Sequence, residues 1–252
     1  MRRIGHVLAS VVGVALIATV AAVAGAATAG GGRSGGIDLG SAQGGPTASV
    51  IDINERSDVL AAGWTPGMVA YRSFVWVRGV NVDLGTLGGR DTYATDINDR
   101  GEVVGYGPID GTGTTHAFVW RAGRMSDLGT LGGSRSAASA INDDGEIVGT
   151  SDATDGTSHA FLVTRGRMTD IGRFRPVDIN ERGQIVGTAT NRIVVWERGR
   201  LRELDTTALG NGCEATRIDE RGEVVGRCGR GAEFGEPPRS FLWDGRTAVL
   251  LD

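Results

Sequence analysis

The chain has 252 residues, of which 42 are glycine, and its formal net charge at pH 7 is −4. The chain contains no lysine, and its arginines are scattered along the sequence rather than clustered. This distribution argues against nucleic acid as a partner. The length is sufficient for one large β domain or two small domains.

The N-terminus has the layout of a secretory signal peptide. Arg2 and Arg3 precede an uncharged apolar run at 7–23, and small residues typical of cleavage sites follow at 24–29. We therefore predict a signal peptide at residues 1–29, secretion of the mature chain, and no stable membrane span after cleavage. An uncleaved membrane anchor is the alternative, because about 17 apolar residues are just enough to cross a bilayer.

From residue 48 onward, the sequence repeats itself about every 40 residues. Each repeat contains an isoleucine followed by Asn or Asp, then a polar pair, a glycine, an acidic or amide residue, two aliphatic residues and a second glycine. The marker pairs are Ile53-Asn54, Ile97-Asn98, Ile141-Asn142, Ile179-Asn180 and Ile218-Asp219. In the first repeat, Ser57 and Ala61 replace the two glycines.

Each repeat predicts four short β-strands. An apolar run, usually containing Phe and Trp, follows the marker, and a glycine turn and a polar-apolar stretch come next. These runs lie at 73–76, 117–120, 160–163, 193–196 and 240–243. Short runs of β-branched and aromatic residues between turn signals are typical of strands, and glycines interrupt every helical apolar period. The Asn-x-x-Gly corner suits a type I turn with glycine in the left-handed conformation.

Five four-stranded units of this size predict an all-β fold, a propeller-like array of five repeats and most simply a five-bladed β-propeller. We assign residues 48–252 to this domain and residues 30–47 to a glycine-rich linker. Within the linker, Ile37–Ser41 resembles the fourth strand of a repeat and is a candidate ring-closing strand, although 247–251 offers the last repeat a fourth strand of its own. Phenylalanines of the third strands are expected to pack between units; they are Phe74, Phe118, Phe161 and Phe241.

The second and third repeats also carry a recognisable combination of motifs, namely His116–Trp120, Leu128–Gly133, Ile141-Asn142 and Ile147–Gly149. With these motifs, the chain resembles the HAF family of bacterial extracellular repeats over roughly residues 37–252. The resemblance is weaker in the first, fourth and fifth repeats. It implies an exported bacterial repeat protein, propeller-like in fold, with no assigned reaction and no catalytic residues to carry over.

Ligand contact is expected where the long connections gather. In an antiparallel four-strand unit, the second-to-third connection and the unit-to-unit connection emerge on the same face, here called the long-loop face. Residues found in single units are better binding candidates than periodic ones. The candidates are Trp64, Tyr71, Tyr93, Asp110, Phe234 and Glu236.

A basic residue opens the third strand in every repeat, at Arg72, His116, His159, Arg192 and Arg239. Two interpretations remain open, an anion-binding ring or structural pairs with carboxylates of the same unit. Their periodicity favours the structural pairs. The carboxylates concerned are Asp83, Asp127, Asp170 and Glu203.

Cys213 and Cys228 flank the last Ile-Asp corner, and in an exported chain with no other cysteine they predict a disulfide. A two-residue turn would place them directly opposite, whereas a three-residue turn with a bulge would turn them to different faces. Asp152 and Asp155 share a loop but lack the ligand set of a calcium site, so no metal and no cofactor is predicted.

Serine-hydrolase, zinc-protease and phosphate-loop motifs are missing from the mature sequence. We therefore predict a secreted, non-catalytic binding or scaffold module whose partner is an extracellular or cell-wall ligand, either a polysaccharide or a protein. The alternatives are a carbohydrate-binding, lectin-type propeller and, since carboxylates are numerous, a secreted glycoside hydrolase or lyase.

Overall fold

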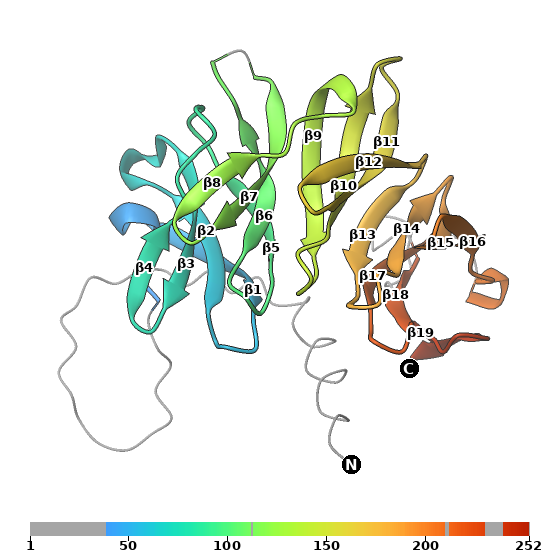
Figure 1. Cartoon of the computed structure of the whole chain (residues 1–252). Coiled ribbons are helices and arrows are strands. Elements are labelled where there is room, and N and C mark those ends of the chain that lie inside the picture. The colour runs from blue at the N-terminus through green and yellow to red at the C-terminus, as the bar shows by residue number, and fades with distance from the viewer. Residues whose placement is uncertain (1–38, 112, 210–211, 230–238, 252) are drawn as a thin grey trace, which may run out of the picture.

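The computed structural model describes residues 39–111, 113–209, 212–229 and 239–251, and it confirms the predicted five-bladed β-propeller (Figure 1). Each repeat forms one antiparallel sheet whose four strands follow one another in space as they do in the sequence. The sheets, numbered here as blades 1 to 5 in chain order, stand around a central channel. The first strand of each blade lines that channel.

Strand bounds are as follows. Blade 1 contains β1 (Thr47–Ile53), β2 (Val59–Trp64), β3 (Tyr71–Val77) and β4 (Val80–Asp83). Blade 2 contains β5 (Tyr93–Ile97), β6 (Val103–Pro108), β7 (Thr115–Arg121) and β8 (Arg124–Asp127). Blade 3 contains β9 (Gly132–Ile141), β10 (Ile147–Ala153), β11 (Ser158–Thr164) and β12 (Arg167–Gly172). Blade 4 contains β13 (Arg175–Ile179), β14 (Ile185–Ala189), β15 (Arg192–Glu197) and β16 (Arg200–Glu203). Blade 5 contains β17 (Cys213–Ile218), β18 (Val224–Cys228), β19 (Arg239–Trp243) and β20 (Ala248–Leu251). Short 3₁₀ turns are η1 (Ala42–Gly44), η2 (Pro66–Met68) and η3 (Thr207–Leu209).

The marker asparagine both closes its own turn and reaches the next blade. In blade 2, the Asn98 side-chain oxygen accepts the backbone N–H groups of Arg100 and Glu102, and Gly101 takes the left-handed φ of +77° that the turn requires. The Asn98 amide then donates to the carbonyl of Asn142 at 3.0 Å. The same donation links blade 1 to 2, blade 3 to 4 and blade 4 to 5.

The second glycine of the repeat is explained by a close backbone approach. A Cβ on Gly105 would lie 2.1 Å from the carbonyl oxygen of Tyr93 on the neighbouring strand, and a Cβ on Gly149 would lie 2.1 Å from that of Ala137. The approach accompanies a β-bulge in each first strand. The bulged residue lies two positions before the marker isoleucine, as Thr95 lies before Ile97.

The hydrophobic core consists largely of clusters between consecutive blades. One cluster joins each pair from blades 1–2 to blades 4–5, and the third-strand phenylalanines Phe118, Phe161 and Phe241 are fully buried in them. Phe74, the equivalent in blade 1, instead packs against Ala42 of η1. Among the described residues, no such cluster joins blade 5 to blade 1.

The candidate ring-closing strand is only partly described. Ile37 and Asp38 lie outside the described residues, and the carbonyl of Leu39 accepts a hydrogen bond from the Asn81 side chain on β4. The fourth strand of blade 5 is β20.

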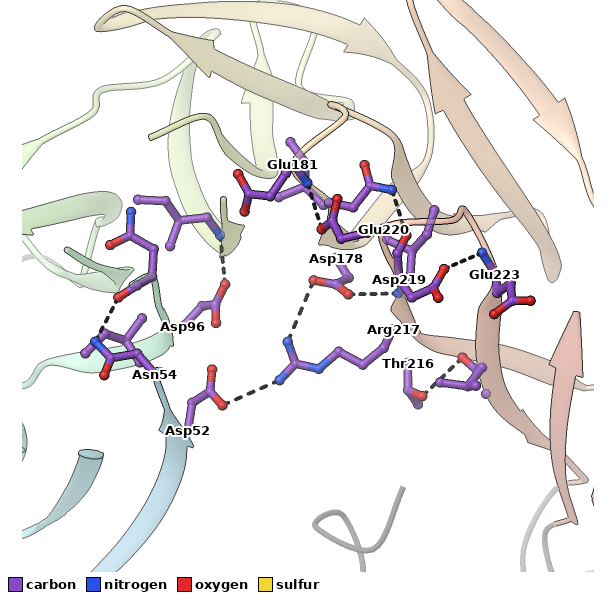
Figure 2. A pocket seen from close by; sticks show the side chains of 18 of the residues that line it. Asp52, Asn54, Asp96, Asp178, Glu181, Thr216, Arg217, Asp219, Glu220 and Glu223 are labelled. Carbon is purple, nitrogen blue, oxygen red and sulfur yellow. Dashed lines mark hydrogen bonds and ion pairs between the residues drawn. The ribbon is translucent and has the colours of Figure 1, made fainter. Parts of the chain in front are cut away.

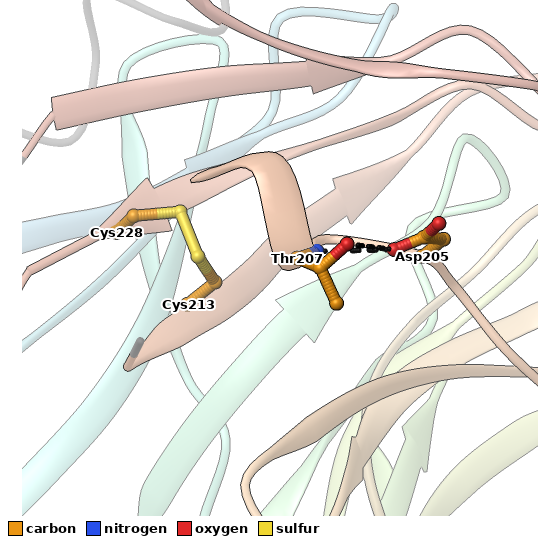
Figure 3. Close-up of a disulfide and its surroundings, with 4 residues drawn as sticks. All are labelled: Asp205, Thr207, Cys213 and Cys228. Carbon is orange, nitrogen blue, oxygen red and sulfur yellow. Dashed lines mark hydrogen bonds between the residues drawn. A yellow bond between two sulfur atoms is a disulfide. The ribbon is translucent and has the colours of Figure 1, made fainter. Parts of the chain in front are cut away.

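Figure 3 shows the predicted Cys213–Cys228 disulfide, which the structure confirms. The two cysteines are direct cross-strand partners on β17 and β18, with Cα atoms 3.9 Å apart. The bulge between Ala215 and Arg217 brings them into register. Because Ile218 pairs with Val224, an unbroken register would place Cys213 opposite Gly229, and the bulge shifts its partner to Cys228.

In blades 1 to 4, the basic residue that opens the third strand pairs with a carboxylate of the same blade, as the structural interpretation predicted. Arg72 lies 2.9 Å from Asp83. The other pairs are His116–Asp127 at 2.8 Å, His159–Asp170 at 2.6 Å and Arg192–Glu203. In blade 5, Leu250 stands at the position that the carboxylate holds in the other blades.

Candidate functional site

Four aromatic rings form a continuous row on the long-loop face of blades 1 and 2, here called the aromatic strip. Trp64 meets Tyr71 edge to face, with ring centroids 5.5 Å apart. Tyr71 stacks on Tyr93 at 5.4 Å, and Tyr93 stacks on Tyr106 at 5.2 Å. Three of the six predicted binding residues are therefore brought together from two blades.

Strand register creates the aromatic strip. Trp64 and Tyr71 are cross-strand partners where β2 and β3 meet, and Tyr93 and Tyr106 are partners on β5 and β6. The two pairs are joined because the chain entering blade 2 bonds to the start of β3: the N–H of Tyr71 donates to the Asp91 carboxylate at 2.8 Å.

The aromatic strip is accessible, and two of its phenol groups have raised pKa values. Trp64 is 39% exposed, and the three tyrosines are half-buried. Burial raises the pKa of Tyr71, with a further contribution from Tyr106. Burial and the nearby Asp91 carboxylate raise the pKa of Tyr93. Both phenols therefore remain hydrogen-bond donors at neutral pH.

The other predicted loop residues are not part of the aromatic strip. Asp110 is exposed in the connection between β6 and β7, while Phe234 and Glu236 lie outside the described residues. Tyr106 was missed because it lies within a strand. Its equivalents in the other blades are not aromatic, which is the signal that could have found it; they are Ala62, Thr150, Thr188 and Arg227.

The second candidate site is the central cavity, of about 670 Å³, on the opposite face of the molecule (Figure 2). Its mouth is formed by the Asn-x-x-Gly corners. In each corner, an acidic residue directly follows the marker pair. From blade 2 to blade 5, its carboxylate accepts the backbone N–H of the equivalent residue in the preceding blade. The carboxylates are Glu55, Asp99, Asp143, Glu181 and Glu220.

The residue before the marker isoleucine is aspartate in blades 1, 2 and 4, alanine in blade 3 and arginine in blade 5, and the charged side chains line the deeper part of the cavity. Figure 2 shows Arg217 between Asp178 and Asp52, at distances of 3.7 and 3.8 Å. Asp178 also accepts the N–H of Ile218, and Asp96 accepts the N–H of Ile141. These residues were not among the predicted binding candidates, although a position that is charged in four of the five repeats is a recognisable signal.

Asp96 retains its proton to a higher pH than an ordinary aspartate. Burial raises its pKa well above the usual value of 3.8, and the hydrogen bond with Asp52 acts in the same direction. Burial also raises the pKa of Asp178. At pH values between the usual aspartate pKa and these raised pKa values, the folded chain binds more protons than the unfolded chain. The free energy of unfolding therefore falls as pH rises through this interval.

We therefore expect Asp96→Asn to reduce the loss of stability between pH 4 and pH 7, because the amide keeps an acceptor for the Ile141 N–H but cannot ionise. Denaturant unfolding of the wild type and of Asp96→Asn across this pH range measures the free energy of unfolding and tests the prediction. Asp144→Asn, which removes an exposed carboxylate on the same face, is the control. The same pH dependence in wild type and Asp96→Asn would contradict the assignment.

Among the described residues, no three His, Cys, Asp or Glu side chains are placed to hold a metal ion together. The two loop aspartates considered for calcium face different partners, since Asp152 pairs with Arg135 and Asp155 with Arg173. No helix in the described ranges is long and apolar enough to span a membrane.

Neither family models nor curated protein sequences match the chain. Among solved structures, it is similar to the β-propeller domain of the Trilobed protease from Pyrococcus furiosus, described as having an open velcro topology, with 12% identity and a TM-score of 0.52 over 81% of this chain and 69% of that one. It is also similar to an acylaminoacyl peptidase from Pyrococcus horikoshii, with 13% identity and a TM-score of 0.47 over 77% of this chain. The match spans 32% of the peptidase's own length. At such identities, the likeness shows the propeller fold alone.

Proposed function

We propose that this protein is a secreted, non-catalytic binding module of the HAF type that holds a polysaccharide chain on the aromatic strip. The aromatic strip is the observation that carries the proposal. Sugar rings present apolar C–H faces that pack against aromatic side chains, and their hydroxyls bond to phenols and carboxylates. Trp64, Tyr71 and Tyr93 supply both kinds of contact on the face where ligand binding is expected.

Carbohydrate binding, first considered as an alternative, now has the better support, because the aromatic residues are contiguous rather than isolated. The non-catalytic assignment is supported by the placement of the histidines in the described ranges. His116 and His159 are each held by a carboxylate of the same blade, and neither lines the central cavity.

The test is retention of the mature chain, Gly30 to Asp252, on insoluble polysaccharides and cell-wall material, with the supernatant examined for released products. We expect retention without products. Trp64→Ala should weaken binding by about two- to tenfold, the equivalent of roughly 0.5–1.5 kcal/mol for one aromatic contact. Leu201→Ala, which shortens an exposed apolar residue on blade 4, should leave retention unchanged.

Each other outcome has a definite meaning. Released sugars would replace this proposal with the glycoside hydrolase or lyase alternative. Equal retention of wild type and Trp64→Ala would move the binding site away from the aromatic strip. No retention on any polysaccharide would overturn the proposed ligand class.

A further inference from the structure

Blades 5 and 1 meet at a seam that differs from the other blade junctions. Ile53 on β1 is 58% exposed, whereas the marker isoleucines of the other four blades are 5–7% exposed. On the opposing side, Val225 is partly exposed, although its equivalents in the other blades, Leu60, Val104, Val148 and Val186, are fully buried. Within the described ranges, the seam therefore has two apolar sheet faces that are not covered by a neighbouring blade as such faces are elsewhere.

The sequence gives a local reason for this opening. The marker of blade 5 is Ile218-Asp219, and a carboxylate cannot donate the hydrogen bond that each marker asparagine gives to the next blade. Blades 1 and 5 are joined instead by the long ion pair between Arg217 and Asp52, at 3.8 Å.

Apolar seam faces and the charged cavity are continuous. Ile53 of blade 1, together with Val225, Leu242 and Leu251 of blade 5, lines the same cavity as the channel aspartates. Val225 and Leu242 are cross-strand partners, so they form one apolar row facing the opening. A ligand in the seam would thus contact apolar side chains and the channel together.

The cavity is strongly negative. Ten of its lining residues carry carboxyl groups, and two carry guanidinium groups. Its mouth carboxylates also repel one another. Burial raises the pKa of Glu181, and repulsion by the neighbouring charges of Asp143 and Glu220 raises it further. A cationic group would relieve this repulsion, particularly in a partly enclosed site where screening is weak.

We propose that the seam binds an extended peptide segment of a protein partner, with apolar side chains against Ile53 and the blade 5 row and an arginine or lysine side chain directed into the cavity mouth, toward the Glu55 and Glu220 carboxylates of the two blades that border the seam. Charge complementarity selects the basic residue, and the uncovered sheet faces select its apolar neighbours. The site is independent of the aromatic strip, which lies on the opposite face.

The experiment uses the immobilised mature protein and two heptapeptide pools. In one, a central arginine lies between valines and the outer positions are randomised; in the other, neutral citrulline replaces the arginine. We expect at least tenfold greater retention of the arginine pool by mass spectrometry, and a decrease as salt is raised. Equal retention of the two pools, or retention of neither because blade 5 closes directly on blade 1, would overturn the proposal.

Two matched variants locate the site. Ile53→Arg places a cation on the exposed seam residue, where it would repel the arginine pool, and should reduce retention of that pool at least tenfold. Val80→Arg makes the same change at a residue of blade 1 that is 61% exposed on the outer strand, and it should have no effect. Neither variant should alter polysaccharide retention, so failure of this proposal is distinguishable from failure of the proposed function. Unchanged peptide retention by Ile53→Arg would rule out the seam.

Discussion

Phe118→Ala is expected to lower the free energy of unfolding by about 3–5 kcal/mol, the usual cost of removing a buried phenylalanine ring. Phe118 is fully buried between blades 1 and 2, in a cluster that includes Leu60 and Ile97. Its ring also lies over Gly105, where a Cβ would come within 3.0 Å of it. Because rigid strands surround the ring on both sides, the cavity left by truncation cannot readily collapse.

Phe74→Ala is the matched control, since Phe74 holds the same position in blade 1. Its cluster contains only small side chains, Ala42 and Ala61 with Ala48 at the edge. The cost should therefore be smaller than that of Phe118→Ala by about 1 kcal/mol or more. Guanidinium unfolding of both variants measures the difference. Equal costs would mean that blade 5 packs on this face in solution and that the seam is closed.

The number and order of strands could be predicted because the repeat constrains them at every turn. Asn98 fixes the corner through its side-chain oxygen, Gly101 supplies the left-handed residue, and Phe118 supplies interblade packing. Each function is local or concerns adjacent repeats, so residue type and spacing are sufficient to identify it.

The channel residues could not be predicted in the same way. Which side chains of a first strand face the channel depends on the bulge, because one extra residue exchanges the two faces of a strand. Asp96 directly follows such a bulge, at Thr95. The bulge position cannot be inferred from residue type, since Ile51 and Thr216 hold the same place in other blades.

The aromatic strip was predicted in part for a related reason. Trp64, Tyr71 and Tyr93 adjoin the long connections, whereas Tyr106 enters the row only through its cross-strand pairing with Tyr93. The open seam depends on contacts between the first and last blades. Those contacts involve the greatest separation in sequence, where a periodic pattern carries little information.

Removing the disulfide should destabilise the blade that borders the seam. We expect the double variant Cys213→Ala/Cys228→Ala to lose about 3 kcal/mol of unfolding free energy, the entropy of a closed loop of roughly 15 residues. Both cysteines are buried in the cluster that joins blades 4 and 5, so alanine at these positions keeps the surroundings apolar. The measurement is denaturant unfolding of the wild type and the variant, each with and without a reducing agent.

Reduction should destabilise the wild type to nearly the level of the variant and leave the variant itself unchanged. A variant as stable as the oxidised wild type would show that the link contributes little, so that β17 and β18 are held by their cross-strand pairing and by the contacts with blade 4 alone. If instead the loss far exceeds the loop entropy, blade 5 separates from blade 4 when the link is removed. This is the expected weak point of a ring in which, among the described residues, a hydrophobic cluster joins the last blade to blade 4 but not to blade 1.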